Sequence, residues 1–402
     1  MTVEFRPATK EEMERFQYVA ANVFVSTQNP DATLVMQPEL TYCAFEDGKL
    51  ATAYAEWPLT MRFNGNGAPI AGVTFVGTLP VYRRRGYLRK IMTDRFETLH
   101  EQGERAIAAL YASRAAIYQR YGYAVVSTHG SYNVDPRDLQ FSVPQDVPGT
   151  FREMVDDEFS VLVELYRHFR AERTGYIHRG KAMWDYGVLM APTTRGGLLS
   201  KVIYWENGEP QGYLIYVLES PPGGDASGPN QRLTIRDLVW LTPAAYRAVW
   251  NYIANMDLVG NVVWSHVPDD DPLPHLLLEP RMLRKTSGDG LLGRIIDVEK
   301  ALPQRHYDEE GVLTFEIKDD LCPWNQGWGK LEASTAGSSV GLTDEEPQLT
   351  MPVSTLAMLM FGQMSASEAA RMARLDVSDG SALPLWDKVM RTKYRPACAD
   401  TF

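Results

Sequence analysis

The chain has 402 residues, of which 45% are hydrophobic, and this is enough for two or three domains with apolar cores. Its formal net charge of −11 argues against nucleic acid or an anionic membrane as the main partner and favours cationic ligands. The sequence has no apolar run of transmembrane length, and Met1–Phe5 lacks the basic and apolar regions of a signal peptide, so we expect a cytoplasmic protein.

The cysteine and histidine content argues against disulfides and metal sites. Cys43, Cys322 and Cys398 are odd in number and widely spaced, which indicates a reducing compartment. The seven histidines have no metal-ligand spacing, and the cluster of His266 and His275 with three nearby aspartates is more typical of a loop at a domain edge. We therefore expect no metal.

The most informative segment is an arginine-rich turn, Arg83–Gly86, between a β-branched run that ends at Thr78 and an amphipathic helical pattern. The first turn of a helix has unpaired backbone N–H groups, and the helix dipole favours an anion there. Gly86 lets the backbone approach a pyrophosphate closely, and Arg83, Arg84 and Arg89 add charged donors. The pattern predicts a phosphate-binding turn; the alternative is a solvated or ion-paired arginine surface.

A second group of elements follows this helix. The sequence predicts a strand at 106–110, a short helix at 115–120 and an aromatic turn, Tyr121-Gly122-Tyr123. The short helix contains Tyr118. This arrangement resembles the second half of a GNAT acyltransferase core, which implies that Tyr118 lies beside the thioester sulfur. A tyrosine has an ordinary pKa near 10, similar to that of an alkyl thiol, so in that place it can give a proton to the departing thiolate. Because most single tyrosines are core aromatics, the position of Tyr118 before the aromatic turn carries this interpretation.

The remaining sequence divides into two further blocks. Proline and glycine at 144–149 interrupt the pattern, so we predict domains at 1–145, 146–290 and 291–402. In the second block we predict helices at 161–173 and 243–253 and strands at 201–205, 212–217 and 233–239. In the third we predict strands at 311–317, 328–333 and 348–351 and helices at 353–361 and 366–375.

These motifs resemble those of known acyltransferases. Arg83 and Gly86 match the acetyl-CoA loop of the GNAT superfamily, Gln/Arg-x-x-Gly-x-Gly/Ala, whose last position is Leu88 here. The short helix with Tyr118 and the aromatic-Gly-aromatic turn resemble the second half of a GNAT core. The whole chain resembles the Eis (enhanced intracellular survival) N-acetyltransferases through the segments 72–76, 83–86, 117–123, 271–277 and 289–295 and through the terminal residue, Phe402.

The resemblance implies a fold of the α/β and α+β classes. It consists of tandem GNAT-like domains, with mixed sheets flanked by helices, followed by an α+β domain similar to sterol carrier proteins. The second domain has no Arg-x-x-Gly turn and is not expected to hold CoA. The third domain is expected to deliver the C-terminal carboxylate to the first. The family commonly forms hexamers, so the resemblance also implies a homo-oligomer with six subunits.

The resemblance further implies an acetyl-CoA-dependent N-acetyltransferase. The acceptor would be a primary amine of a polycationic small molecule or peptide, similar to an aminoglycoside, a polyamine or lysine, and transfer would be direct, within a ternary complex. Tyr118 would protonate the CoA thiolate, and the carboxylate of Phe402 would take a proton from the amine. The expected acetyl-CoA contacts are Val76, Thr78, Arg83, Arg84, Gly86, Tyr87, Arg89 and Ser113. The expected acceptor contacts are Phe24, Ser26, Met36 and Thr401.

Two alternatives remain open from the sequence. One is a tandem-GNAT acyltransferase that uses a longer acyl-CoA, because N-myristoyltransferases also pair two such domains with a C-terminal carboxylate. The other is a non-enzymatic protein that binds CoA or lipid. The presence of Arg83, Gly86, Tyr118 and Phe402 argues against the second alternative.

Overall fold

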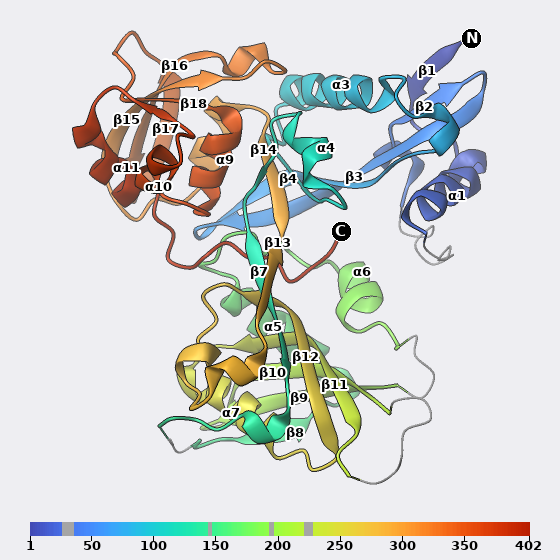
Figure 1. The fold of residues 1–402 in the computed structure, drawn as a ribbon, viewed down its shortest axis with the longest axis vertical. Coiled ribbons are helices and arrows are strands. Elements are labelled where there is room, and N and C mark those ends of the chain that lie inside the picture. The colour runs from blue at the N-terminus through green and yellow to red at the C-terminus, as the bar shows by residue number, and fades with distance from the viewer. Residues whose placement is uncertain (26–35, 144–146, 193–196, 221–227) are drawn as a thin grey trace. The chain divides into compact units, whose positions relative to one another are not determined.

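The computed structural model describes residues 1–25, 36–143, 147–192, 197–220 and 228–402, and these residues form two compact units. Unit 1 consists of residues 1–126, 291–392 and 402. Unit 2 consists of residues 127–290 and 393–401. Figure 1 traces the chain through both units. Among the described residues, no helix is long and apolar enough to cross a membrane.

The first sheet of unit 1 has seven strands in the order β1-β2-β3-β4-β5-β14-β6. The strands are β1 (Val3–Arg6), β2 (Cys43–Glu46), β3 (Lys49–Phe63), β4 (Asn66–Thr78), β5 (Ile107–Tyr111), β6 (Ala124–Val125) and β14 (Leu291–Ile295). Helices α1 (Met13–Phe24), α3 (Tyr87–Gln102) and α4 (Ala115–Gln119) belong to the same part of the chain. Ala44 and Phe45 are neighbours on β2, but Ala44 packs in the core of α3 and Phe45 in that of α1. Because successive strand residues point to opposite faces, α1 and α3 cover opposite faces of this sheet.

Helix α3 forms where the sequence pattern predicts it. It begins directly after Gly86 and ends before Gly103, whose φ of +72° suits a glycine at a helix C-terminus. The residues that recur at helical spacing are buried against the sheet: Ile91, Met92, Phe96 and Leu99. This packing holds the start of the helix, and the arginine turn before it, at the end of β4.

The second sheet of unit 1 has five strands in the order β17-β16-β15-β18-β19. Its elements are β15 (Gly311–Lys318), β16 (Gly327–Ser334), β17 (Gly337–Leu342), β18 (Leu349–Pro352), β19 (Asp376–Val377), α8 (Val298–Ala301), α9 (Val353–Phe361), α10 (Ala366–Arg371) and α11 (Leu383–Val389). A buried ion pair links this part to the first sheet, because Arg294 of β14 donates to both carboxylate oxygens of Asp319 at 2.8 Å.

The sheet of unit 2 has seven strands in the order β13-β7-β12-β11-β10-β9-β8. Its elements are β7 (Thr128–Val134), β8 (Thr150–Glu153), β9 (Leu198–Glu206), β10 (Glu209–Glu219), β11 (Gln231–Trp240), β12 (Val259–Pro268), β13 (Thr286–Asp289), α5 (Phe159–Phe169), α6 (Lys181–Met183) and α7 (Pro243–Ala254). Strands β11 and β12 are parallel and the other pairs are antiparallel. Each unit therefore contains a mixed sheet with helices, as expected from the sequence.

The compact units depart from the predicted boundaries because strands pair across them. β14 pairs with β5 and β6, while β7 pairs with β12 and β13. The chain therefore leaves the first sheet after Val126 and returns to it at Leu291. Residues 127–143 fold with unit 2 rather than with the first predicted domain, and so do residues 393–401 of the third. The proline and glycine residues near 145 mark a local break in the pattern, whereas strand pairing decides which unit a segment joins.

Candidate active site

The first sheet of unit 1 opens between two neighbouring parallel strands. Among the described residues, β4 and β5 pair only at Ala71–Ala108 and Gly72–Ala109, although β4 continues to Thr78. A bulge lies in this free part of β4, because the pairing with β3 shifts register there and Phe75 has a φ of +53°. The main-chain groups of β4 beyond Gly72 are thus not used by β5 and are available to a ligand.

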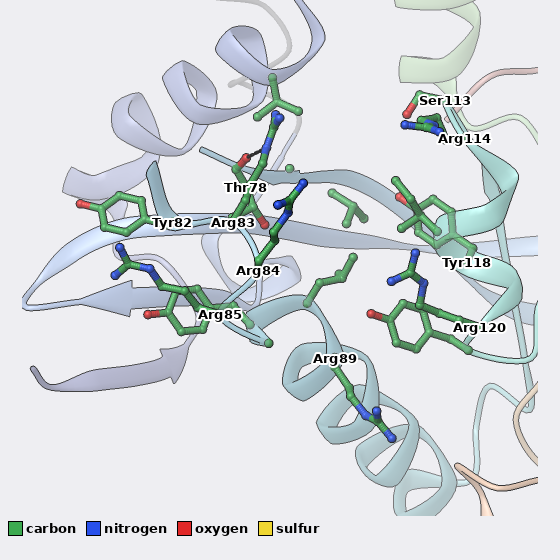
Figure 2. Close-up of a pocket in the computed structure, with 18 of the residues that line it drawn as sticks. Thr78, Tyr82, Arg83, Arg84, Arg85, Arg89, Ser113, Arg114, Tyr118 and Arg120 are labelled. Atoms are coloured by element: carbon green, nitrogen blue, oxygen red, sulfur yellow. Dashed lines mark hydrogen bonds between the residues drawn. The ribbon is translucent and has the colours of Figure 1, made fainter. Parts of the chain in front are cut away.

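A pocket of about 680 Å³ lies at this opening. It is lined by the end of β4, the turn before α3, the start of α3 and the residues around α4. All eight predicted acetyl-CoA contacts line it: Val76, Thr78, Arg83, Arg84, Gly86, Tyr87, Arg89 and Ser113. Figure 2 shows Arg83 and Arg84 on one side of the pocket and Ser113, Arg114, Tyr118 and Arg120 on the α4 side.

The turn before α3 has the backbone geometry of an anion site. Arg84 and Gly86 have φ of +65° and +83°, and Gly86 is the N-cap of α3 without a side-chain hydrogen bond to the helix. The first turn of α3 contains no acidic residue. Arg83 folds back on the strand end, where its Nε donates to the carbonyl oxygen of Thr78 at 3.1 Å. The helix N-terminus is therefore open to an anion and flanked by positive charge.

A buried carboxylate holds this turn from behind. Glu46 of β2 is 7% exposed and accepts hydrogen bonds from Arg85 and from the hydroxyl of Tyr87. These two contacts, the tyrosine first, lower the pKa of Glu46. Arg85 also donates to the carbonyl oxygen of Val81 at 2.9 Å. The hydroxyl of Tyr87, a predicted cofactor contact, is thus hydrogen-bonded to Glu46 rather than free for a ligand. Arg85 connects the turn to β2 through the same carboxylate.

Tyr118 lies on the opposite wall of the pocket. It is 7% exposed, lines the pocket, and packs edge to face on Tyr123 with ring centroids 5.9 Å apart. Burial, with a smaller effect of Tyr121, raises the pKa of Tyr118 to about 12. The hydroxyl is therefore neutral over the physiological pH range and can donate a hydrogen bond or a proton.

The C-terminal residue lies at the point where the strands begin to diverge. The ring of Phe402 packs edge to face on Tyr111, at the end of β5, with centroids 5.7 Å apart. A Cβ atom on Gly72, in the last β4–β5 pair, would lie 3.1 Å from the same ring. The same Cβ atom would lie 2.5 Å from the side chain of Leu59, so glycine at position 72 leaves room for Leu59 first and also for the terminal aromatic residue in unit 1.

The predicted acceptor contacts are not gathered in one place. Phe24, at the end of α1, is 46% exposed and lines the pocket. Ser26 lies outside the described residues. Met36 is 4% exposed and packs in the core between α1 and the sheet. Its side chain is therefore part of the hydrophobic core and does not line the pocket. Thr401 is exposed and belongs to unit 2.

Sequence reasoning did not select two arginines of the pocket, Arg114 and Arg120, which flank α4. The sequence signal that could have found them was their position at the two ends of the short helix that contains Tyr118. Six arginines line the pocket, and none of the lining residues that the structure describes is acidic. Within the same described ranges, no group of three or more histidine, cysteine, aspartate or glutamate side chains could hold a metal ion.

Comparison with known families identifies three regions of the chain. Residues 4–126 and residues 175–295 each match an acetyltransferase (GNAT) domain, and residues 298–399 match a sterol carrier protein domain. These matches confirm the predicted order of two GNAT domains followed by a sterol-carrier-like domain.

Individual relatives agree with these matches. An uncharacterized N-acetyltransferase from Streptomyces avermitilis is 30% identical, over 92% of this chain and 90% of its own. The N-acetyltransferase Eis of Mycobacterium tuberculosis is 28% identical, over 78% of this chain and 76% of its own. The crystal structure of Eis1 from Mycobacterium abscessus superposes with a TM-score of 0.84 at 25% identity, over 99% of this chain and 100% of that one.

Proposed function

Because the chain belongs to the Eis family of N-acetyltransferases, within the GNAT superfamily, we propose that it transfers the acetyl group of acetyl-CoA directly to a primary amine of a polycationic acceptor. The observation that carries the proposal is the pocket at the β4–β5 opening. It combines an uncapped helix N-terminus, arginine side chains and a free strand edge, and these fit a diphosphate joined to an amide-containing arm.

The donor side uses groups of unit 1. The turn at Arg83–Gly86 and the first residues of α3 would hold the pyrophosphate of acetyl-CoA, whose thioester supplies the activated acetyl group. The free edge of β4 would pair with the amides of the pantetheine arm. The N–H of Val76 would donate to the thioester carbonyl, whose oxygen gains negative charge when the amine attacks.

Tyr118 would stabilise the departing thiolate. The pKa of Tyr118, about 12, exceeds the ordinary value of a thiol, so complete proton transfer from its hydroxyl to the CoA thiolate is uphill. A hydrogen bond from the neutral hydroxyl stabilises the developing charge first, and the proton follows as the C–S bond breaks. Burial of Tyr118 thus keeps the donor protonated at neutral and mildly alkaline pH.

The carboxylate of Phe402 would accept the proton of the attacking amine. A free α-carboxyl group has an ordinary pKa of about 3.5, so it is a weak base at neutral pH unless burial or a bound water assists it. The packing of Phe402 on Tyr111 and Gly72 supports this role, because it anchors the terminal residue beside the strands of the donor site.

The proposed acceptor follows from charge. The net charge of −11 favours association with cations, and a polycationic amine offers several positive groups to such a surface. Phe24 would contact the acceptor at the edge of the pocket. We also propose that the protein is a homo-oligomer, with six subunits by resemblance to the family, and mass photometry of the purified chain tests this.

Release of free thiol from acetyl-CoA tests the proposed function, with polyamines, aminoglycosides and lysine peptides as acceptors. We expect turnover with at least one class. Deleting Phe402 should abolish turnover and leave CoA binding intact, since the carboxylate acts on the amine. Adding one glycine after Phe402 should have the same effect, because it displaces the carboxylate while keeping the ring.

The matched control is Phe402→Leu, which replaces the aromatic ring with an aliphatic side chain and keeps the terminal carboxylate on residue 402. We expect this variant to retain more activity than the chain extended by glycine. Equal activity of the intact and glycine-extended chains would contradict the role of the carboxylate. Failure of the intact chain to bind CoA would contradict the donor assignment.

A further inference from the structure

The pocket contains more positive charge than a pyrophosphate requires. Arg83, Arg84 and Arg89 belong to the turn and the first turn of α3, where the pyrophosphate is proposed to bind. Arg114 and Arg120 lie on the α4 side of the pocket, opposite that turn (Figure 2). Two separate groups of cations around one pocket indicate a ligand with anionic groups at two places.

These arginines differ from others in the same chain. Within the part of the chain that the structure describes, none of the five forms an ion pair, whereas Arg85, between Arg84 and Gly86, pairs with Glu46. The chain has 51 acidic residues against 40 lysine and arginine residues, so acidic partners are abundant elsewhere. Gathering five cations around a pocket without acids costs electrostatic energy that an anionic ligand offsets.

Arg120 is the cation of the α4 side that lies toward the phosphate end of the pocket. Arg114 directly follows Ser113, close to the end of β5 and across the opening from the free edge of β4, along which the uncharged pantetheine arm is proposed to run. Arg120 lies six residues further, about 9 Å along α4. The charges of Arg120 and Arg89 both act on Tyr121, a buried residue of the pocket wall, so Arg120 is near the first turn of α3.

Contacts within the protein leave Arg120 free to bind an anion. Its Nε approaches the carbonyl oxygen of Ala116, one turn earlier in α4, at 3.4 Å. This is a long contact. Among the described residues, the two terminal nitrogens of Arg120 donate no hydrogen bond to the protein. The terminal nitrogens of a guanidinium are the pair that binds a phosphate in a fork.

We propose that Arg120 binds the 3′-phosphate of CoA and so makes the enzyme select CoA over dephospho-CoA. CoA carries this phosphate on its ribose, near the pyrophosphate and far from the thioester, which agrees with the position of Arg120 toward the first turn of α3. The inference rests on the proposed acetyl-CoA site. It assigns to Arg120 a role in donor specificity that is separate from acetyl transfer.

Isothermal titration calorimetry with CoA and with 3′-dephospho-CoA tests this proposal. We expect the intact protein to bind CoA about tenfold to a hundredfold more tightly than dephospho-CoA, the range for a charge-assisted hydrogen bond. Arg120→Gln should remove this preference by weakening only CoA binding. The preference of the intact protein should also fall as salt is raised, because Arg120 is exposed.

Three matched variants separate the possible outcomes. Arg84→Gln should weaken both ligands equally, because it acts on the shared pyrophosphate. Arg167→Gln, an exposed arginine of unit 2 that pairs with Glu164, should change neither constant. Retention of the preference in Arg120→Gln, or its loss in Arg114→Gln alone, would overturn the proposal. Equal binding of both ligands by the intact protein would also overturn it, whereas binding of neither would overturn the acetyl-CoA site as well.

Discussion

Each unit contains a pair of parallel strands that diverge, and the two openings are used differently. In unit 1, β4 and β5 part after Gly72 and leave a pocket of about 680 Å³. In unit 2, β11 and β12 pair from Gln231 to Ile235 and then diverge, but the cavity there is only about 40 Å³. The same backbone arrangement thus provides a ligand site in one unit and a packed core in the other.

The first difference lies at the helix that follows the central strand. The N-cap of helix α3 is Gly86, which offers no side chain to the first turn. The N-cap of helix α7 is Thr242, whose hydroxyl accepts a hydrogen bond from the N–H of Ala245 at 3.0 Å. A side-chain cap satisfies the group that an anion would otherwise bind, so α7 is closed to phosphate and α3 is open.

The second difference is what fills the opening. In unit 2 the C-terminal segment 393–401 packs into it, with Ala397 in the core and Ala399 lining the small cavity. Asp400 is buried and accepts hydrogen bonds from Arg179 at 2.7 Å and from Tyr166 at 3.1 Å. Arg179 also pairs with Asp237 of β11. The chain's own tail therefore occupies the place that a ligand takes in unit 1.

Among single substitutions in the open site, removing the hydroxyl of Tyr118 should have the largest effect on turnover. We expect Tyr118→Phe to lower kcat by about 10²- to 10⁴-fold, the usual range for a general acid, with little change in CoA affinity. Steady-state kinetics with a saturating acceptor measures this. Because the pKa of Tyr118 is about 12, its ionisation should not reduce the rate of the intact enzyme at neutral or mildly alkaline pH.

A neighbouring tyrosine provides the control. Tyr123 is fully buried beside Tyr118, and its hydroxyl has no hydrogen-bond partner in the described structure. Tyr123→Phe should therefore keep kcat near that of the intact enzyme. Similar rates for Tyr118→Phe and the intact protein would show that Tyr118 is not the proton donor.

In unit 2, where the tail fills the opening, breaking the buried ion pairs should cause the largest loss of unfolding free energy. Arg179→Met leaves the carboxylates of Asp237 and Asp400 without their cation, and we expect unit 2 to lose about 3–5 kcal/mol of unfolding free energy. Urea unfolding followed by tryptophan fluorescence measures this loss. Arg167→Gln, which breaks the exposed pair with Glu164, should cost less than about 1 kcal/mol. Comparable losses in the two variants would contradict a structural role for the tail contact.

The smallest expected effect concerns the helix start that distinguishes the units. Asparagine and aspartate tolerate the positive φ of Gly86, so both can be introduced with modest strain. Gly86→Asp adds a negative charge at the proposed pyrophosphate site and should weaken CoA binding about tenfold to a hundredfold, while Gly86→Asn should weaken it less. Calorimetry with CoA measures both variants. Equal affinity of the aspartate and asparagine variants would argue that no phosphate binds there.

Local patterns were enough to predict the donor side of the site. The residues from Thr78 to Gly103 form strand, turn and helix through contacts between near neighbours in sequence, and glycines at positions 86 and 103 bound the helix. The helix at 353–361 was predicted at the bounds that the structure has, because an apolar run between Pro352 and Gly362 has few alternatives. The order of the three domains followed from resemblance, and the family comparisons confirm it.

Contacts between distant residues decided the rest. Sequence alone determined that an arginine turn precedes a helix and that Tyr118 lies on a short helix. The tertiary structure decided that Glu46 binds Arg85, that Arg120 faces the same pocket as Arg84, and that the tail fills the opening in unit 2. The physical reason is the sequence separation over which each interaction acts. Helix capping and helical periodicity depend on residues a few positions apart, whereas ion pairs and strand pairing join segments separated by tens or hundreds of residues.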